Sequence, residues 1–250
     1  MQMKDLQDRH AGKMGFVIGA SPSLHNVDPN LLKDYVTITV NSGVLKIPNC
    51  DYFLSDDIGA KWWNYWHDTV KHSNCIKLLF EDKLRSEAGH FDPEKVVYFK
   101  HKWWFQPPRK YNLPDGLIMT KNAELPIIGA RTSAGSAVHM AYIMGCDPIV
   151  LLGCDCCYGP KNLRYFWQYP GETKAYRING EPVFCHANNG KMFNKTVDHH
   201  CVEFMEYWTK LAKINQGTCN IVYASEGGIL SCFPVMTLNE VLAKYGERKR

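Results

Sequence analysis

The chain has 250 residues, of which 45% are apolar and 22% are charged, and its formal net charge is +4. This composition is typical of a globular protein, and so mild a charge does not by itself indicate nucleic-acid binding. No apolar run reaches the roughly 18 residues that a membrane span needs, and Met1–Met14 lacks the apolar stretch of a secretory signal. We therefore expect a cytoplasmic protein with no membrane span.

Short apolar segments that end in small or polar residues recur along the chain. The first is Phe16–Ile18, which leads into Gly19-Ala-Ser-Pro-Ser23, and this transition is typical of the opening strand of an α/β sheet. Similar patterns predict further strands at residues 36–40, 51–54, 75–80, 96–99, 148–152 and 220–224.

The middle of the chain carries the strongest helical pattern. Thr132 and Ser133 precede the apolar segment 137–144, and Gly145 follows it, so we predict a capped helix that stops at this glycine. The nearly continuous apolar run at 148–152 is typical of a parallel strand that is buried on both faces. Two further helices are predicted, at 198–214 and 238–245.

Residues 158–195 are rich in Tyr, Trp, Gly, Pro and Asn and show no sustained period. Structureless segments of this length are usually functional or disordered, so we predict an irregular lid or long loop over a site. The alternation of strands and helices along the rest of the chain predicts one α/β domain over residues 1–250, with a mostly parallel sheet.

The expected carboxyl ends of the strands carry small or polar residues, and ligands of open α/β sheets bind at these ends. The N-terminus of the helix that begins near Thr132–Gly135 adds free N–H groups and a positive dipole end, which suit a phosphate. Gly19-x-Ser-Pro-Ser23 lacks both the dinucleotide fingerprint and the lysine of the Walker A loop. We expect a nucleotide site of another kind, with a capped structural turn as the alternative for this segment.

Four motifs occur in a fixed order: Gly19-x-Ser-Pro-Ser23-Leu24, Val40-Asn41, Thr132-Ser133-x-Gly135 and Gly153-x-Asp155-x-x-Tyr158. Over roughly residues 15–235 the chain resembles a superfamily that contains metal-independent bacterial sialyltransferases, Maf flagellin-modification proteins and the archaeal 6-hydroxymethylpterin pyrophosphokinase. Many uncharacterised bacterial and phage proteins belong to it as well. The resemblance implies a single Rossmann-like, GT-A-like domain that binds a nucleotide.

The resemblance also implies roles for individual residues. The ligands of the activated nucleotide would be Gly19, Ser21, Ser23, Asn41, Thr132, Ser133 and Gly135. Asp155 would stand at the next strand end, and Tyr158, with Tyr165, would bond to the leaving-group phosphate. A lid histidine would take the proton of the acceptor hydroxyl, as a side chain with a pKa near pH 7 can. That position falls near Phe193 in this chain, and the nearest candidates are His186, our first choice, and His199 and His200.

Acidic and thiol groups near the expected site admit two interpretations each. Asp56 and Asp57 are suited to a divalent metal, or to capping the helix that follows them. Cys154, Cys156 and Cys157 lie close together, but C-x-C-C lacks the spacing of a zinc chelate, so buried thiols at a strand end are the favoured interpretation. The chain has ten cysteines, and we expect them to be reduced.

Two clusters of tryptophans are the remaining notable pattern. Trp62, Trp63 and Trp66 would place two indoles on one helical face, and Trp103-Trp104-Phe105 lies beside basic residues. A satellite core is one interpretation, and a stacking surface for sugars or bases is the other. As a binding surface, the clusters would hold the acceptor in preference to the nucleotide.

These observations favour a transferase with a nucleotide-activated donor, most simply a sialyltransferase-like glycosyltransferase that acts on the hydroxyl of a glycan, protein or modified base. A magnesium-dependent pyrophosphokinase is a second hypothesis, in which Asp56, Asp57 or Asp155 would bind Mg²⁺. A non-catalytic protein that binds nucleotides or nucleic acid is a third. The expected partners are a nucleotide or nucleotide-sugar, and the sequence leaves open whether the protein forms a homo-oligomer.

Overall fold

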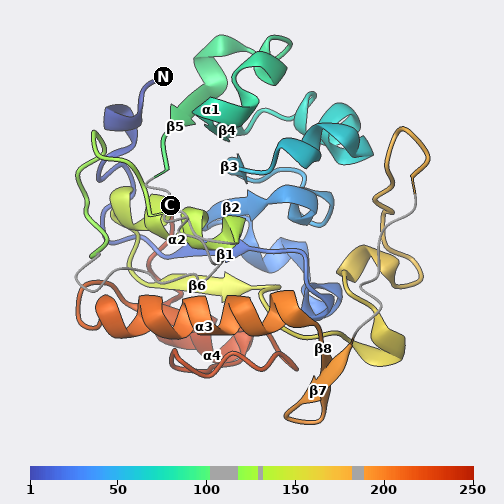
Figure 1. The fold of residues 1–250 in the computed structure, drawn as a ribbon. Helices are drawn as coiled ribbons and strands as arrows, with labels where there is room; N and C mark the ends of the chain where they lie inside the picture. The colour runs from blue at the N-terminus through green and yellow to red at the C-terminus, as the bar shows by residue number, and fades with distance from the viewer. Residues whose placement is uncertain (102–117, 129–131, 182–188) are drawn as a thin grey trace, which may run out of the picture.

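The computed structural model describes residues 1–101, 118–128, 132–181 and 189–250, and within them seven strands form one sheet (Figure 1). The strand order is β5-β4-β3-β2-β1-β6-β9, and all neighbouring strands run parallel. The expected α/β fold with a mostly parallel sheet is confirmed. The strands are β1 (Gly15–Ile18), β2 (Val36–Val40), β3 (Tyr52–Ser55), β4 (Ile76–Phe80), β5 (Val96–Phe99), β6 (Ile149–Leu152) and β9 (Ile221–Tyr223).

The chain builds this sheet in two directions from β1. It adds β2 to β5 in order on one side, and it then returns to place β6 and β9 on the other side. Ile18 at the end of β1 is therefore paired with Thr39 of β2 and with Leu152 of β6. This reversal is the switch point of the sheet, where open α/β proteins bind their ligands beyond the carboxyl ends of the strands.

Both faces of the sheet are covered. The helices are α1 (Glu81–Leu84), α2 (Ser133–Ile143), α3 (His199–Ile214) and α4 (Leu238–Tyr245). Val17 and Leu151 pack on the face that α2 and α3 cover, whereas Phe16 and Val150 pack on the face of α4. Figure 1 shows α2 and α3 in front of the sheet. All four strand side chains are fully buried, which explains why the strands are unbroken apolar runs in the sequence.

Short helical turns make up the crossovers between β1 and β5. They stand where many α/β proteins have longer helices, and proline occupies the first position of three of them. Because such a turn can begin directly after a strand, polar residues such as Asn41 stay at the carboxyl edge of the sheet. The turns are η1 (Met3–Leu6), before β1, and η2 (Pro22–Asn26), η3 (Pro29–Leu32), η4 (Asn41–Leu45), η5 (Ile58–Trp62), η6 (Trp66–Val70), η7 (Ser86–Ala88) and η8 (Pro93–Lys95).

The segment predicted to be irregular contains only short elements where it is described. These are the turns η9 (Pro160–Asn162) and η10 (Phe166–Gln168) and the hairpin strand β7 (Gly190–Met192), which pairs with β8 (Lys195–Val197). The backbone N–H of Phe166 donates to the carbonyl of Ala20 at 3.1 Å, directly after β1. Among the described residues, none of the helices has the length and apolar character that a membrane span requires.

A second set of contacts holds this segment against the sheet. The carboxylate of Glu172 accepts a hydrogen bond from Lys46 Nζ at 2.7 Å and lies 2.8 Å from His25 Nδ1. Further along, the backbone N–H of Asn64 donates to the carbonyl of Tyr176 at 3.0 Å. Residues 158–178 are thereby fixed over the carboxyl ends of the strands.

The backbones after β1 and β6 approach each other so closely that a side chain does not fit between them. A Cβ atom at Gly19 would overlap the carbonyl oxygen of Gly153. A Cβ at Gly43 would lie 2.5 Å from the carbonyl oxygen of Gly19, far inside van der Waals contact. Glycine is therefore required at these two turns for packing, whatever ligand binds beside them.

We expect Gly19→Ala to lower the free energy of unfolding by about 3 kcal/mol, at the upper end of overpacking effects, because the obstructing atoms belong to the backbone. Gly89→Ala is the matched control, since a Cβ at Gly89 meets no atom within 4 Å and its φ is −62°. Urea unfolding of both variants measures the difference. Equal stability of the two would contradict this account of the switch point.

Candidate functional site

A cavity of about 550 Å³ opens at the carboxyl ends of β1, β2, β3 and β6. Its floor is the switch point itself, where Gly19, Ser21 and Gly153 line it. The backbone N–H of Ser21 donates to the carbonyl of Gly153 at 2.9 Å, so the two strand-end turns are bonded directly to each other. The first and last motifs in the sequence thus form one surface.

One side of the cavity is the N-terminus of α2 with the ends of β2 and β3. Asn41 donates from Nδ2 to Ser133 Oγ at 3.3 Å and accepts from Ser55 Oγ at 2.9 Å. Asn41 adopts a left-handed conformation with φ of 48°, which asparagine tolerates better than most residues. Thr132 caps α2 by accepting the N–H of Ala134 at 3.3 Å. Three distant segments are therefore joined by short polar side chains.

The carboxylate of Asp56 lies under this end of α2. It accepts hydrogen bonds from the hydroxyl groups of Ser133 and Ser136, the second at 2.8 Å, and His101 Nε2 is 3.5 Å away. Burial raises the pKa of Asp56, and the bonds from both serines and the charge of Lys83 oppose this rise. Asp56 thus occupies the helix end at which a phosphate was expected.

Asp57 has a different role from its neighbour. Its carboxylate caps η5 by accepting the N–H of Gly59 at 2.8 Å. This is the capping interpretation for Asp57, although both aspartates also line the cavity. The part of the chain that the structure describes holds no group of three or more His, Cys, Asp or Glu side chains placed for a metal ion. The magnesium hypothesis stays a prediction.

The opposite side of the cavity is an aromatic wall of four rings: Trp63, Tyr65, Tyr165 and Trp167. Tyr165 and Trp167 stack at 5.0 Å between ring centroids, and Trp63 stacks on Tyr65 at 6.2 Å. Trp63 meets Trp167 edge-on at 5.9 Å, and Trp167 is anchored by its indole N–H, which donates to Ser42 Oγ at 3.1 Å. All four rings line the cavity.

Two arginines lie against this wall. The Arg177 guanidinium is 5.7 Å from the centre of the Trp63 ring and pairs with Glu181, and the Arg164 guanidinium is 5.5 Å from that of Tyr165. Both arginines line the cavity. The tryptophans expected on one helical face point in different directions, because η5 and η6 are not α-helical. Trp66 is in the core, Trp62 is 46% exposed, and Trp63 belongs to the aromatic wall. The cluster at 103–105 lies outside the described residues.

A buried acidic residue stands behind the wall. The side chain of Asp198 is fully buried, caps α3 by accepting the N–H of Cys201 at 2.9 Å, and accepts the hydroxyl of Tyr158 at 3.0 Å. Arg164 Nη1 is 3.5 Å from the same carboxylate. Burial and the bond to Asp198 raise the pKa of Tyr158, so this hydroxyl stays protonated at neutral pH.

The residues expected to bind a nucleotide fall into two groups. Those that line the cavity are Gly19, Ser21, Asn41, Thr132, Ser133 and Tyr158. Those that are directed elsewhere are Ser23, Gly135 and Asp155, which are not among its lining residues. Gly135 has a packing role, because a Cβ there would overlap the ring of Tyr207. His186 lies outside the described residues, while His199 and His200 open α3 beside the cavity without lining it.

Asp155 and Ser23 form a buried pair of their own. The backbone N–H of Ser23 donates to Asp155 Oδ2 at 2.8 Å, and its hydroxyl donates to Oδ1 at 2.5 Å. These bonds tie the turn after β1 to the turn after β6. Burial raises the pKa of Asp155 from 3.8 to about 6, and the two bonds from Ser23 limit the rise. In this structure Asp155 therefore has a structural role, because it holds the two turns together.

The thiols that follow β6 are buried, as the sequence predicts. Cys154, Cys156 and Cys157 are 7%, 8% and 7% exposed. Burial raises the pKa of Cys154 to about 12 and that of Cys157 to about 11. These thiols are therefore poor nucleophiles at neutral pH, although Cys154, Cys156 and Cys157 all contribute surface to the cavity.

Arg164, Arg177 and Asp198 were not singled out from the sequence. The signal that could have found Arg164 is its place in Arg164-Tyr165-Phe166-Trp167, where a cation alternates with aromatic rings. Asp198 carries a weaker signal, since it precedes a predicted helix and is a favoured capping residue.

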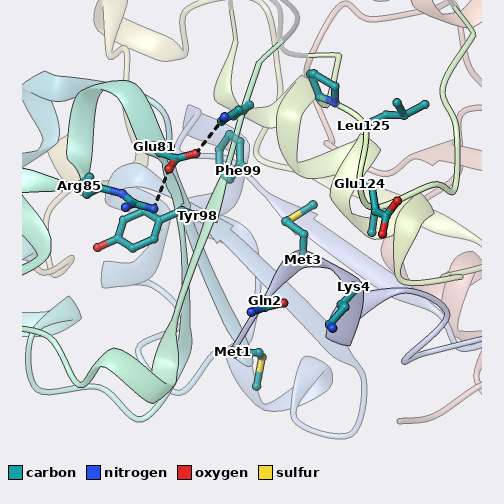
Figure 2. Close-up of a pocket in the computed structure, with 13 residues that line it drawn as sticks. Met1, Gln2, Met3, Lys4, Glu81, Arg85, Tyr98, Phe99, Glu124 and Leu125 are labelled. Atoms are coloured by element: carbon teal, nitrogen blue, oxygen red, sulfur yellow. Dashed lines mark ion pairs between the residues drawn. The ribbon is translucent and has the colours of Figure 1, made fainter.

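A second hollow lies away from the switch point, at the ends of β4 and of the edge strand β5, and has a volume of about 450 Å³ (Figure 2). Three of its charged groups pair with one another: Glu81 contacts Arg85 at 2.6 Å and Lys100 at 3.9 Å. It does not gather side chains from the sequence motifs, so the cavity at the switch point is the better candidate.

The sheet order and the cavity at its switch point define a Rossmann-like α/β protein. A solved structure with this fold is that of the MAf glycosyltransferase from Magnetospirillum magneticum AMB-1, which is 12% identical and gives a TM-score of 0.51 over 98% of the present chain. The chain spans 40% of the length of that protein. No family model matches the sequence, and no curated protein matches it.

We expect the free energy of unfolding of Asp155→Asn to exceed that of the wild type by an amount that grows as pH rises. Because the pKa is 3.8 in a free side chain and about 6 in the fold, the native state binds the extra proton between these values, and the wild type loses stability across pH 4–6. Asparagine does not titrate, so the variant does not lose this free energy, which is about 3 kcal/mol at pH 7. Its amide can still bond to the N–H and the hydroxyl of Ser23. Urea unfolding at pH 4, 6 and 7.5 measures the difference, with the exposed Asp68→Asn as the control. A difference that does not change with pH would contradict the expectation.

We expect Tyr158→Phe to lower the free energy of unfolding by about 2 kcal/mol, because it removes a hydrogen bond to a fully buried carboxylate. Tyr176→Phe is the control, since Tyr176 is 55% exposed. Thermal and urea unfolding compare the variants. If both substitutions have the same small effect, the bond to Asp198 does not carry the stability assigned to it.

Proposed function

We propose that the cavity binds a nucleotide-activated sugar and that the protein transfers the sugar to a hydroxyl group of an acceptor. The observation that carries this proposal is the cavity at the switch point, to which four separate motifs contribute Gly19, Ser21, Asn41, Ser133 and Tyr158. The similarity in fold to a MAf glycosyltransferase supports the same class of reaction. We further propose that the sugar of the donor is a sialic acid, because the sequence motifs resemble those of sialyltransferases.

The proposed reaction is a displacement at the anomeric carbon. The acceptor oxygen forms a bond to this carbon while the bond to the phosphate oxygen breaks, and the electron pair leaves with the phosphate. The hydroxyl proton passes to a base, for which His186, His199 and His200 are the candidates. The aromatic wall is suited to the acceptor, because indole and phenol faces stack on sugar rings. Polar groups that are already fixed, such as Asn41 and Ser133, would orient the donor without reorganising.

A pyrophosphokinase is the second candidate, and one observation favours it. Asp56 and Asp57 both line the cavity, and carboxylates are ligands that Mg²⁺ prefers. In this reaction an acceptor hydroxyl would attack the β-phosphorus of ATP, and AMP would leave with the electron pair of the broken bond.

Thermal unfolding with CMP, UDP, GDP, ATP and their sugar conjugates, each with and without Mg²⁺, separates the candidates. Stabilisation by a nucleotide-sugar that needs no metal is the expected result. Stabilisation by ATP alone, and only with Mg²⁺, would replace the proposal with the pyrophosphokinase. Binding of single-stranded nucleic acid that weakens steeply with salt, with no effect of any mononucleotide, would indicate a non-catalytic binding protein.

Ser133→Ala should weaken binding of the stabilising nucleotide about threefold to tenfold, as the loss of one hydrogen bond does. Ser136→Ala is its matched control. Both serines donate to Asp56, but Ser133 lines the cavity and Ser136 is fully buried away from it. The two variants should therefore lose similar stability, and only Ser133→Ala should lose affinity in a calorimetric titration. Equal affinities would remove Ser133 from the binding site.

A further inference from the structure

The electrostatics of the cavity differ between its two sides. On the α2 side, Asp56 and Asp57 are both lining residues, and Asp56 already lies against the helix end with two serine hydroxyls directed at it. The charge of Lys83 is felt at this carboxylate. A phosphate placed here would meet a buried acidic group where the helix alone would offer a positive dipole end. A phosphate at the end of α2 would therefore lie beside the Asp56 carboxylate, and Lys83, which also lines the cavity, is the cation that acts on this group.

The opposite side carries two guanidinium groups, and the carboxylates that contact them do not line the cavity. The Arg177 guanidinium already has a hydrogen-bond partner, because its Nη1 donates to Glu181 on the protein surface. Arg164 contacts Asp198 at 3.5 Å, and within the described residues its guanidinium forms no hydrogen bond. Its side chain is 21% exposed. Arg164 therefore presents N–H donors to the cavity.

Each oxygen of Asp198 already accepts a hydrogen bond from another donor. The N–H of Cys201 and the hydroxyl of Tyr158 bond to its two oxygens. The single hydroxyl proton of Tyr158 is thereby directed at Asp198, and to donate to a phosphate it would have to leave this buried carboxylate. The contact of Asp198 with Arg164 orients the guanidinium, which also lies over the ring of Tyr165.

We propose that a phosphate group binds at Arg164, on the wall opposite α2, and that Asp198 and Tyr158 position this arginine. The inference rests on the proposed function, since the phosphate would be that of the nucleotide donor. A guanidinium can hold two phosphate oxygens at once, and it stabilises the negative charge that grows on the phosphate as the bond to the sugar breaks. The nucleoside part of the donor would then extend toward Asn41 and Ser133.

The test titrates inorganic pyrophosphate, the nucleotide that stabilises the wild type, and the corresponding nucleoside into the wild type and four variants. Arg164→Gln should bind pyrophosphate and the nucleotide about tenfold or more weakly, as expected for a lost hydrogen-bonded charge, and should bind the nucleoside as the wild type does. Arg164→Lys keeps the positive charge but lacks the paired N–H donors of a guanidinium, so it should recover part of the affinity. Arg177→Gln and Lys83→Gln are the controls, and neither should weaken binding by more than about threefold.

The outcomes separate this proposal from the proposed function. If Arg164→Gln binds the nucleotide normally, or if Lys83→Gln loses affinity in its place, the phosphate site is not at Arg164, while nucleotide binding itself stands. If the wild type binds pyrophosphate through Arg164 but binds no nucleotide, the phosphate site stands and the proposed function falls. A wild type that binds none of the three ligands overturns both. If Arg164→Gln does not fold, Arg164→Lys decides alone, with a loss of affinity for pyrophosphate supporting the proposal and an unchanged affinity overturning it.

Discussion

The close contact between the turns after β1 and β6 is the constraint on which the rest of the structure depends. Gly19 and Gly153 touch through their backbones, and the Asp155–Ser23 pair joins the same two turns below the surface. The cavity floor is consequently a surface of main-chain atoms, with little side-chain freedom. The atoms that a ligand meets there are held in place by the sheet, so binding costs little entropy for ordering them.

Above this floor, the cavity combines two sides of opposite character. The α2 side is a network of short polar side chains around Asp56, and the other side is a stack of rings with arginines on it. Short polar groups suit the hydroxyls of ribose or a sugar, whereas rings and cations suit a flat face and an anion. Hydroxyl groups and a phosphate belong to the proposed nucleotide-sugar donor, and a sugar of the acceptor would supply the flat face, so the asymmetry agrees with a cavity that binds both substrates.

Much of the fold could be predicted from the sequence, because each strand is buried on both faces and is therefore an apolar run. The helices α2, α3 and α4 were predicted from their caps and periods, and the structure confirms them. The turns between β1 and β5 escaped prediction, since η-type turns of three to five residues have no period to detect. For the candidate site, the strand-end rule identified segments that line the cavity but not the direction of each side chain. Ser23 stands two residues from the lining residue Ser21, and Asp155 stands between lining neighbours, yet these two side chains point to each other. Arg164 gains its role only through the distant Asp198.

The segment 158–178 has a consequence for how this protein can diversify. It is bonded to the body at Ala20, Lys46 and Asn64, so its path over the strand ends is held by contacts along its length. Substitutions on its cavity side can therefore reshape the surface offered to an incoming acceptor while the strand ends keep their geometry. Substitutions at Tyr165 or Trp167 would change the surface offered to the acceptor, whereas a substitution at Arg164 would also change the proposed contact with the donor phosphate.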